Sequence, residues 1–386
     1  MSMIDRINAY AGELTALRRD LHAHPELGFE EIRTAGIVAD LLERFGCEVH
    51  RGVAGTGVVG ILKGRTDNGR RIGLRADMDA LPIEEETNLP YRSTVPGKMH
   101  ACGHDGHTTM LLGAARYLAE TRAFDGTAVF IFQPAEEGLG GSRAMLKEGL
   151  FERFPCAEIY GLHNQPGGGR GRIELCTGPM MAAADFFDIR IRGKGSHAAW
   201  PHQSVDPIMI AAGLAQALQS IVSRNTDPLK AIVLSITRME AGASYNVIPE
   251  TAQLAGTIRT LDADIRTMAA TRMRALSEAF AAGYGAEITV ELRDVFSVLD
   301  NAPAQAKAAA DAAQDLLGAE QVDRSILPLM GSEDFADMMM AVPGAYVWLG
   351  AGPGAGLHNA GYDFDDAIIP VGSAFLASMV ERRTAA

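Results

Sequence analysis

Ile72-Gly-Leu-Arg-Ala-Asp-Met-Asp79 is a short apolar strand that runs directly into two aspartates. Three further strand-like segments lead to polar groups in the same way. They are Ala128–Phe132 before Glu136 and Glu137, Glu158–Leu162 before His163, and Ala345–Leu349 before His358. Because functional groups gather at the carboxyl ends of strands in α/β sheets, we expect these side chains to lie close together. Imidazole and carboxylate groups that meet in this way indicate a transition-metal site.

Strand and helix patterns alternate around these four segments. The alternation continues as far as His163 and resumes after Asn301, which predicts an α/β domain with a mostly parallel sheet flanked by helices. The clearest helix is Asp105–Glu120, whose apolar residues fall on one face. Two more helices are expected between Ile4 and Phe45, separated by a segment that contains Pro and Gly.

A different pattern occupies the middle of the chain. Its segments follow the order β-α-β-β-α-β, which is typical of a ferredoxin-like α+β sandwich. The last third of the chain is still needed to bring His358 to the first sheet. We therefore predict a discontinuous metal-binding catalytic domain, residues 1–181 and 296–386, with an inserted ferredoxin-like domain, residues 182–295.

Composition limits the possible functions. The 386 residues allow two domains, and 47% of them are hydrophobic, as in soluble globular proteins. A net charge of −13 without a Lys/Arg cluster argues against partners such as nucleic acid or an anionic membrane. The first residues lack a secretory signal pattern and no apolar run would span a bilayer, so a cytoplasmic protein is expected. Its four cysteines are therefore expected to be free thiols.

Cys102 differs from the other cysteines because histidines surround it. Cys102-Gly-His104 places a thiol and an imidazole just ahead of the predicted helix, whose positive end would help to keep the thiol ionised. A buried cysteine beside surface histidines is the alternative. The matching positions of Glu137, His163 and His358 after strands favour a metal site.

Glu136 and Glu137 are adjacent carboxylates after a buried strand, where their repulsion is little screened. A cation would relieve that repulsion. Since neighbouring side chains point in different directions, one carboxylate can bind metal while the other reaches an activated water. A solvated acidic turn is the alternative.

Asp77 or Asp79 could orient a ligand imidazole through its second nitrogen, or could simply cap a turn.

Three other patterns are weaker. Gly55–Gly60 matches a dinucleotide-binding fingerprint, but a strand follows it instead of a helix, which argues against a nicotinamide enzyme. His22 and His24 precede any strand end and are expected to be structural or to line a pocket. Met338–Met340 has helical spacing and is expected in the core.

A set of motifs spread over nearly the whole chain is recognisable when read together. The motifs are Arg19-Asp-Leu-His-Ala-His-Pro-Glu-Leu-Gly, Leu74-Arg-Ala-Asp-Met-Asp-Ala-Leu-Pro, Met99-His-Ala-Cys-Gly-His-Asp-Gly-His, Gln133-Pro-Ala-Glu-Glu-Gly, Gly161-Leu-His-Asn, Gly195-Ser-His-Ala-Ala-Trp-Pro-His, Gly331-Ser-Glu-Asp-Phe and Leu357-His-Asn. With them, the chain resembles the hippurate hydrolase and auxin-conjugate amidohydrolase branch of the aminoacylase–carboxypeptidase metallopeptidase family.

The resemblance implies a site with two divalent metal ions, which could be zinc, manganese, nickel or cobalt. It makes Glu136 the general base for a hydroxide that bridges the ions, and it gives Asp79 the orienting role. The wider family usually has His-x-Asp at this strand end. Asp77 stands at the His position here, so the role of Asp77 and the identity of the metal stay open. The implied metal ligands are Cys102, His104, Glu137, His163 and His358.

The resemblance also implies roles for the inserted domain. It would be a lid through which the chain forms a homodimer or a tetramer. His197 would reach the active site of the partner subunit and stabilise the oxyanion. Asn246 and Arg259 would hold the α-carboxylate of the substrate.

The implied activity is hydrolysis of an N-acyl amino acid, with a benzoyl, acetyl or similar acyl group, to a carboxylic acid and a free amino acid. A di- or tripeptidase or a carboxypeptidase would use the same site. A non-catalytic metabolite-binding protein is the alternative from a different class, and such a protein would have no need for Glu136.

Overall fold

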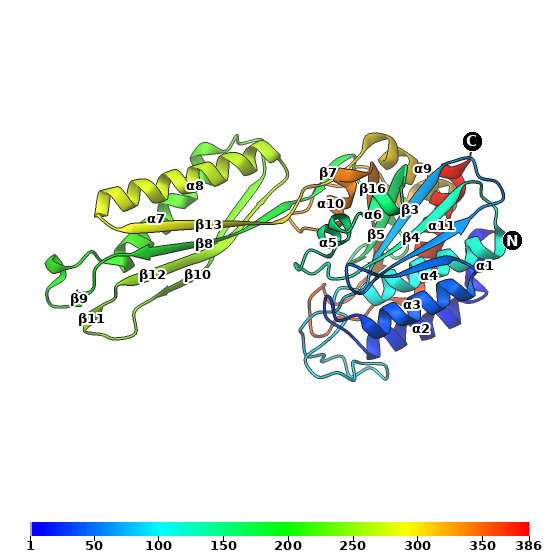
Figure 1. The fold of residues 1–386 in the computed structure, drawn as a ribbon, viewed down its shortest axis with the longest axis horizontal. Helices are drawn as coiled ribbons and strands as arrows, with labels where there is room; N and C mark the ends of the chain where they lie inside the picture. The colour runs from blue at the N-terminus through cyan, green and yellow to red at the C-terminus, as the bar shows by residue number, and fades with distance from the viewer. Residues whose placement is uncertain (1, 386) are drawn as a thin grey trace. The chain divides into compact units, whose positions relative to one another are not determined.

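The computed structural model describes residues 2–385, and the chain folds into two compact units (Figure 1). The first unit consists of Met1–Met180, Leu299–Leu327 and Asp334–Ala386. The second consists of Met181–Val298 and Pro328–Glu333. The short segment Pro328–Glu333 was assigned from the sequence to the first domain. Its backbone is instead tied to the start of the second unit, where the N–H of Ala182 donates to the carbonyl of Gly331 over 2.8 Å.

The first unit is built on one eight-stranded sheet with the order β1-β2-β4-β3-β5-β16-β6-β15. Its four middle strands, β4, β3, β5 and β16, all run parallel to their neighbours within this group. The pairs β1–β2, β2–β4 and β16–β6 are antiparallel. The strands are β1 Glu48–Val53, β2 Gly57–Lys63, β3 Arg71–Asp77, β4 Thr127–Gln133, β5 Glu158–Pro166, β6 Ile173–Glu174, β15 Val322–Asp323 and β16 Gly344–Gly352. The expected α/β class with a mostly parallel sheet is thereby confirmed.

The helices of the first unit are mostly those expected. They are α1 Met3–Asn8, α2 Ala11–Ala23, α3 Ile32–Arg44, α4 His104–Thr121, α5 Gly141–Lys147, α6 Leu150–Arg153, α9 Pro303–Leu317, α10 Phe335–Ala341 and α11 Ile369–Thr384. The N-terminal region forms three helices, so the expectation of two was wrong. The extra break falls at Tyr10, which is buried and whose hydroxyl donates to the carbonyl of Gly113 over 3.2 Å. No local breaker residue signals this long-range contact.

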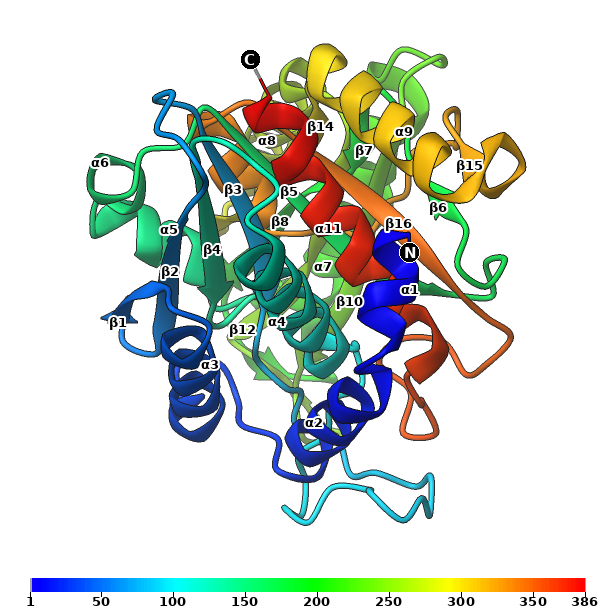
Figure 2. The same cartoon turned by 90° about the vertical axis from the view of Figure 1, so that its right-hand side faces the viewer.

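The largest core of the protein lies between the first sheet and a layer of helices. Helices α1, α2, α4 and α11 contact one another over one face of the sheet (Figure 2). The apolar residues of α4 and α11 are almost completely buried, together with the alanine-rich face of α9. Burial of this surface supplies the main stabilisation of the unit, at about 25 cal/mol per Å² of apolar area. A separate two-stranded sheet pairs β7 Gly178–Met181 with β14 Leu299–Asn301.

The second unit has the predicted β-α-β-β-α-β order and an antiparallel sheet arranged β10-β12-β8-β13. Its main elements are β8 Ala183–Arg192, α7 Pro207–Ser220, β10 Ile232–Ala241, β12 Thr251–Thr260, α8 Ala263–Tyr284 and β13 Glu287–Phe296. A small hairpin-like pair, β9 Ser196–His197 and β11 Val247–Ile248, stands apart from this sheet. Asp206 and Asp262 cap the N-termini of α7 and α8 by accepting backbone N–H groups.

The second unit has its own core. Phe187, Ile189 and Ile191 alternate along β8 and are buried with apolar residues of α7 and α8. The residues between them on β8 face away from this core. Because the apolar cores of the two units are separate clusters, a packing change in one core should leave the other intact.

Other sequence interpretations can be compared with the structure. Gly55–Gly60 leads into β2, so no helix follows the glycines. Met338 is buried, but Met340 is 74% exposed, so the expectation that the whole methionine run lies in the core was wrong. The short helix α10 has one outer face, and Met340 lies on it. All four cysteines are free thiols. Among residues 2–385, no helix combines the length and apolarity needed to cross a membrane.

The separation of the two cores can be tested at Gly256 on β12. A Cβ atom there would lie 2.0 Å from the carbonyl oxygen of Ser235 and 2.6 Å from the ring of Phe187. We expect Gly256→Ala to destabilise the second unit by about 1–3 kcal/mol through overpacking. Thermal unfolding followed by circular dichroism and metal content should show a lower-melting second unit with metal binding unchanged.

Gly283→Ala is the matched control, because a Cβ atom at this position on α8 would meet nothing within 4 Å. Its melting temperature should equal or exceed that of the wild type, since alanine is a better helix former than glycine. A Gly256→Ala protein with wild-type stability, or one that loses its metal, would contradict the account of two independent cores.

Candidate active site

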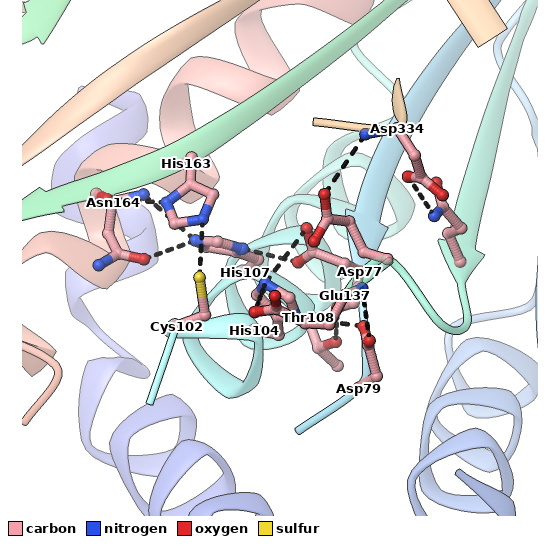
Figure 3. Close-up of polar contacts among 12 residues, drawn as sticks. Asp77, Asp79, Cys102, His104, His107, Thr108, Glu137, His163, Asn164 and Asp334 are labelled. Carbon is pink, nitrogen blue, oxygen red and sulfur yellow. Dashed lines mark hydrogen bonds and ion pairs between the residues drawn. The ribbon is translucent and has the colours of Figure 1, made fainter. Parts of the chain in front are cut away.

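The predicted ligands meet because the four parallel strands of the first sheet are also the strands that carry them. Asp77 ends β3, Glu136 and Glu137 follow β4, His163 lies on β5, and His358 follows β16. These strands are direct neighbours in the order β4-β3-β5-β16, so their carboxyl ends share one edge of the sheet. Figure 3 shows Asp77, Glu137 and His163, from the ends of β3, β4 and β5, turned toward one another.

Helix α4 brings Cys102 and His104 to the same edge. Gly103, its N-cap, has φ +93°, a conformation that L side chains rarely adopt. A Cβ atom at Gly103 would also lie 2.3 Å from the amide oxygen of Asn164. Glycine therefore allows this tight turn to place the thiol and the imidazole beside β5. The backbone N–H of His358 donates to the carbonyl of Ala101 over 2.8 Å, which holds the last ligand segment against this turn.

Five side chains place donor atoms close enough to share metal ions. The Sγ of Cys102 lies 3.4 Å from the Nε2 of His163. The Oε1 of Glu137 lies 3.2 Å from the Nε2 of His358 and 3.9 Å from the Nε2 of His104. Two sets have all their donor atoms within 4.8 Å of one another and share Cys102. These sets are Cys102–His104–His163 and Cys102–Glu137–His358.

The chemistry of these donors fits a transition-metal pair. The Nε2 of His104 is buried and has no hydrogen-bond partner among residues 2–385, and the buried Oε1 of Glu137 faces the imidazoles of His358 and His104. Burying a polar atom without a partner is costly, and a cation would satisfy both atoms. A thiol, imidazoles and a carboxylate are the donors that Zn²⁺ and related ions prefer.

The protonation states of the donors depend on burial and on neighbouring charges. Burial, followed by the charge of Glu137, raises the pKa of Cys102 well above its usual range. The helix end was expected only to assist ionisation of this thiol together with a metal, and burial opposes that assistance in the metal-free protein. A bound cation would be needed to form the thiolate. Burial and then His107 lower the pKa of His163, so this imidazole is neutral and can donate a lone pair.

Asp79 contacts two of the predicted ligands through groups other than their proposed metal-binding atoms. Its Oδ1 lies 3.2 Å from the Nδ1 of His104, and its Oδ2 accepts the backbone N–H of Glu137 over 2.9 Å. With Asp79 ionised, the first contact would place the proton of His104 on Nδ1 and leave Nε2 free to bind metal. One carboxylate therefore fixes two of the predicted ligands.

Asp77 holds a histidine that the sequence analysis did not assign to the site. Its Oδ1 lies 2.6 Å from the Nδ1 of His107, and its Oδ2 accepts from Arg75 over 2.7 Å. The Nε2 of His107 lies 2.7 Å from the amide oxygen of Asn164. Burial opposes the charge of Asp77, but His104, Arg75 and His107 together hold its pKa well below its usual range. The spacing of His104 and His107 on one helix face could have revealed this contact.

Glu136 lies beside the ligand cluster in a constrained turn. It is 7% exposed, and its carboxylate falls within 4.8 Å of donor atoms of His104 and Glu137. Its Oε1 accepts the backbone N–H of Asp334 over 3.3 Å. The preceding residue, Ala135, has φ +54°, a strained conformation for a residue with a side chain. Such strain persists where the surrounding structure fixes the turn.

Glu31 holds the strained turn in place. Its Oε1 accepts the backbone N–H of Ala135 over 2.9 Å, and its Oε2 accepts the hydroxyl of Thr56 over 2.6 Å. Glu31 is fully buried, and burial raises its pKa. The sequence analysis did not single out Glu31, because its partner Ala135 is more than 100 residues away.

The remaining predicted residues lie in the second unit. His197 is exposed on β9, and Asn246 immediately precedes β11, whose Val247 pairs with His197. Arg259 lies on β12, is half-buried, and donates to the hydroxyl of Ser332 over 2.6 Å. Burial lowers the pKa of Arg259, since its charge is partly desolvated. The structure thus brings His197 and Asn246 together on one pair of short strands.

His22 and His24 do not join the ligand cluster. His22 is buried, with its Nδ1 2.9 Å from Asp105 and its Nε2 3.4 Å from Glu85. His24 is partly exposed and its Nδ1 contacts the carbonyl of Asp20. Both histidines therefore have structural contacts, as the sequence favoured.

Comparison with known proteins identifies the family of this chain. A model of the peptidase family M20/M25/M40 matches residues 73–382. The chain belongs to this family. Three M20 relatives cover nearly the whole chain. A hippurate hydrolase of Campylobacter jejuni is 41% identical over 98% of both chains. An N-acetylcysteine deacetylase of Bacillus subtilis is 42% identical over 96% of this chain and 97% of the relative. IAA-amino acid hydrolase ILR1-like 4 of Arabidopsis thaliana is 37% identical over 97% of this chain and 86% of the relative.

A solved M20 structure has the same overall fold. The YXEP protein of Bacillus subtilis, described as a dinuclear metal binding peptidase, matches with a TM-score of 0.86 and 37% identity. The match covers 98% of this chain and 99% of that protein. The family and the branch expected from the motifs are thereby confirmed.

The tight turn at Gly103 gives a direct test of the ligand arrangement. In Gly103→Ala, the new methyl group would force Asn164 or the Cys102 backbone to move, and the residue would be strained at positive φ. We expect bound metal to fall at least about tenfold, the range seen when groups that support ligands are changed. Elemental analysis after dialysis measures this loss.

Gly36→Ala on α3 is the control, because a Cβ atom there would meet nothing within 4 Å. It should bind as much metal as the wild type. Full metal content in a folded Gly103→Ala protein would show that Cys102 and His104 are not held for metal binding by this turn.

Proposed function

We propose that this M20 protein is a metal-dependent amidohydrolase that cleaves the amide bond of N-acyl amino acids. The products would be a carboxylic acid and a free amino acid. The observation that carries the proposal is a second carboxylate, Glu136, fixed beside a cluster of donor atoms that already has its own carboxylate, Glu137. A site that only binds metal has no need for Glu136, whereas hydrolysis requires a base. The names of the hippurate hydrolase and deacetylase relatives support the same reaction class.

Two divalent cations would be held by the five donors described above. We propose zinc, manganese, nickel or cobalt, because the donor set includes both a soft thiol and harder carboxylate oxygens. When bound, such ions lower the pKa of water and polarise the amide carbonyl. Asp79 would keep the His104 ring oriented, while Asp77 and Asn164 would do the same for His107.

Glu136 would act as the general base and then as the general acid. Its carboxylate takes a proton from the attacking water as the new C–O bond forms. It then returns this proton to the leaving nitrogen as the C–N bond breaks, so that no net proton is lost. The backbone N–H of Asp334 binds one oxygen of this carboxylate and so helps to fix its direction for the transfer.

We propose that the second unit supplies substrate contacts and acts as the lid. Arg259 is a half-buried cation whose hydrogen-bond partner Ser332 is neutral, so a substrate carboxylate would compensate its desolvation. Asn246 would contribute to the same carboxylate. His197, exposed on β9, would donate to the developing oxyanion in the partner subunit of a dimer.

Exposed apolar side chains on the second unit support dimer formation through it. Large hydrophobic residues on a surface are typical of protein interfaces. They include Trp200, 54% exposed, Met209, 62%, Met239, 52%, and Tyr245, fully exposed. The ring of Trp200 lies 4.9 Å from that of His197, which places one of these residues beside the proposed oxyanion donor.

The free cysteines fit a reducing compartment such as the cytoplasm.

The role of Glu136 predicts the behaviour of Glu136→Gln. Glutamine has nearly the same shape but cannot accept the proton, so kcat should fall by at least about 10²-fold, in the range attributed to general acid–base catalysis. Activity should be measured on benzoyl-, acetyl- and indole-acetyl amino acids and on dipeptides, with each metal restored after chelation. Metal content should stay at the wild-type level.

The same substrate panel tests the proposed function itself. A preference for dipeptides over acyl amino acids would favour the peptidase alternative. If Glu136→Gln kept normal turnover, Glu136 would not be the base. No turnover of any substrate by the metal-loaded wild type would contradict the amidohydrolase proposal.

A shared active site predicts complementation between inactive variants. His197→Ala and Glu136→Gln would each inactivate a different component of the site, so mixed dimers should contain one site with both components intact. We expect mixtures refolded or co-expressed together to recover up to about a quarter of wild-type activity, because half of the sites in half of the dimers are repaired at equal mixing. Absence of recovery in mixed dimers verified by differential tagging would argue against sharing.

A further inference from the structure

Arg75 is a fully buried cation in the middle of the first sheet, two residues before Asp77 at the end of β3. Only 1% of its side chain is exposed. A guanidinium in such a position is stable only when it is paired and hydrogen-bonded. Arg75 contacts Asp77 over 2.7 Å, Asp334 over 3.2 Å and the amide oxygen of Gln133 over 2.9 Å. It therefore joins the end of β3 to the end of β4 and to the segment before α10.

Asp334 is anchored through both of its carboxylate oxygens. Its Oδ1 accepts from Arg75 and also from the Nε2 of Gln133 over 2.7 Å. Its Oδ2 accepts the backbone N–H of Ser142 over 3.0 Å. With a side-chain exposure of 1%, Asp334 is as buried as its arginine partner. The position of its backbone is thus set by three donors from three different elements, β3, β4 and α5.

The anchored backbone of Asp334 faces the proposed base. Its N–H donates to the Oε1 of Glu136 over 3.3 Å (Figure 3). Gln133 lies three residues before Glu136 on the same turn and binds Arg75 and Asp334 at once. The base and its N–H donor are therefore fixed to one buried framework, and any shift of Asp334 would move the donor away from Glu136.

We propose that Asp334, supported by Arg75 and Gln133, is a positioning residue that orients the carboxylate of Glu136 for proton transfer. This inference rests on the proposed role of Glu136 as the base. The side chain of Asp334 binds Arg75, Gln133 and Ser142 while its backbone N–H reaches the base, so we expect its effect at the base. Catalysis is sensitive to such placement, since a displacement of about 1 Å can cost about 10²-fold in rate.

A purely structural role for Asp334 predicts a different outcome from a positioning role. Loss of a structural ion pair would reduce stability and metal content together. Loss of orientation at Glu136 would reduce kcat while leaving KM and metal content near their wild-type values, because substrate and metal contacts are kept. The two roles can thus be separated by measuring all four quantities on the same variants.

The experiment compares Asp334→Ala and Asp334→Asn with a control three residues along the chain, Asp337→Ala. Asp337 is 7% exposed and pairs with the Nε of Arg143 over 2.8 Å, but it is not part of the framework that holds Glu136. Each variant of the full-length, metal-loaded protein is assayed on the best acyl amino acid substrate. Metal content is measured by elemental analysis and folding by circular dichroism.

We expect Asp334→Ala to lower kcat by at least about tenfold, with KM within about threefold of wild type and metal content unchanged. Asp334→Asn should restore most of kcat, because its amide oxygen can still accept from Arg75 and Gln133. Asp337→Ala should keep kcat within about threefold of wild type despite the loss of an ion pair. If Asp334→Ala does not fold, Gln133→Leu, which removes two of the same hydrogen bonds, should show the same loss of kcat.

Crystal structures of the wild type and Asp334→Ala give a second readout that does not depend on turnover. Glu136 should change its side-chain conformation or occupy several conformations in the variant. Wild-type kcat in folded Asp334→Ala, or metal loss in proportion to activity, would overturn the inference. An unmoved Glu136 would overturn it too. If instead the wild type hydrolyses no substrate, the proposed function fails, and the conformation of Glu136 still decides the inference.

Discussion

The crowding of buried thiol, imidazole and carboxylate groups at one edge of the sheet is the constraint on which the rest of this structure depends. The carboxylate of Glu137, the thiol of Cys102 and the imidazole of His104 point toward one another in an environment that would penalise each of them alone. The burial that raises the pKa of Cys102 disfavours a thiolate in the absence of a cation. Cations resolve this conflict, and the sheet topology explains why the donors meet at all.

The residues around the cluster restrict movement of its donor side chains. Gly103 and Ala135 both adopt left-handed backbone conformations; Asn164 packs closely against the first, and Glu31 holds the turn that contains the second by a hydrogen bond. Asp79 fixes two donors from behind. A second layer of buried charge, formed by Asp77, Arg75 and Asp334, links the ligand side of the site to the proposed base. Such a support layer holds reactive groups within the narrow geometry that catalysis needs.

Much of the fold and of the site could be predicted from the sequence. Short apolar runs indicate strands, and the carboxyl ends of neighbouring parallel strands lie at the same edge of a sheet. The sheet class, the β-α-β-β-α-β order and the convergence of Cys102 with His163 and Glu137 followed from that reasoning. What could not be predicted depends on long-range contacts. The break between the first two helices falls at Tyr10, whose hydroxyl binds the distant carbonyl of Gly113, and the N–H of Asp334 reaches Glu136 across nearly 200 residues of sequence.

The central claim is that five side chains of the first unit hold two divalent cations. Crystals grown with manganese and measured for anomalous scattering at the manganese edge test it most directly. The account predicts two anomalous peaks among Cys102, His104, Glu137, His163 and His358. Glu136 should lie beside the peaks without binding either ion. Peaks elsewhere in the molecule, or a map with no peak near Cys102, would contradict it.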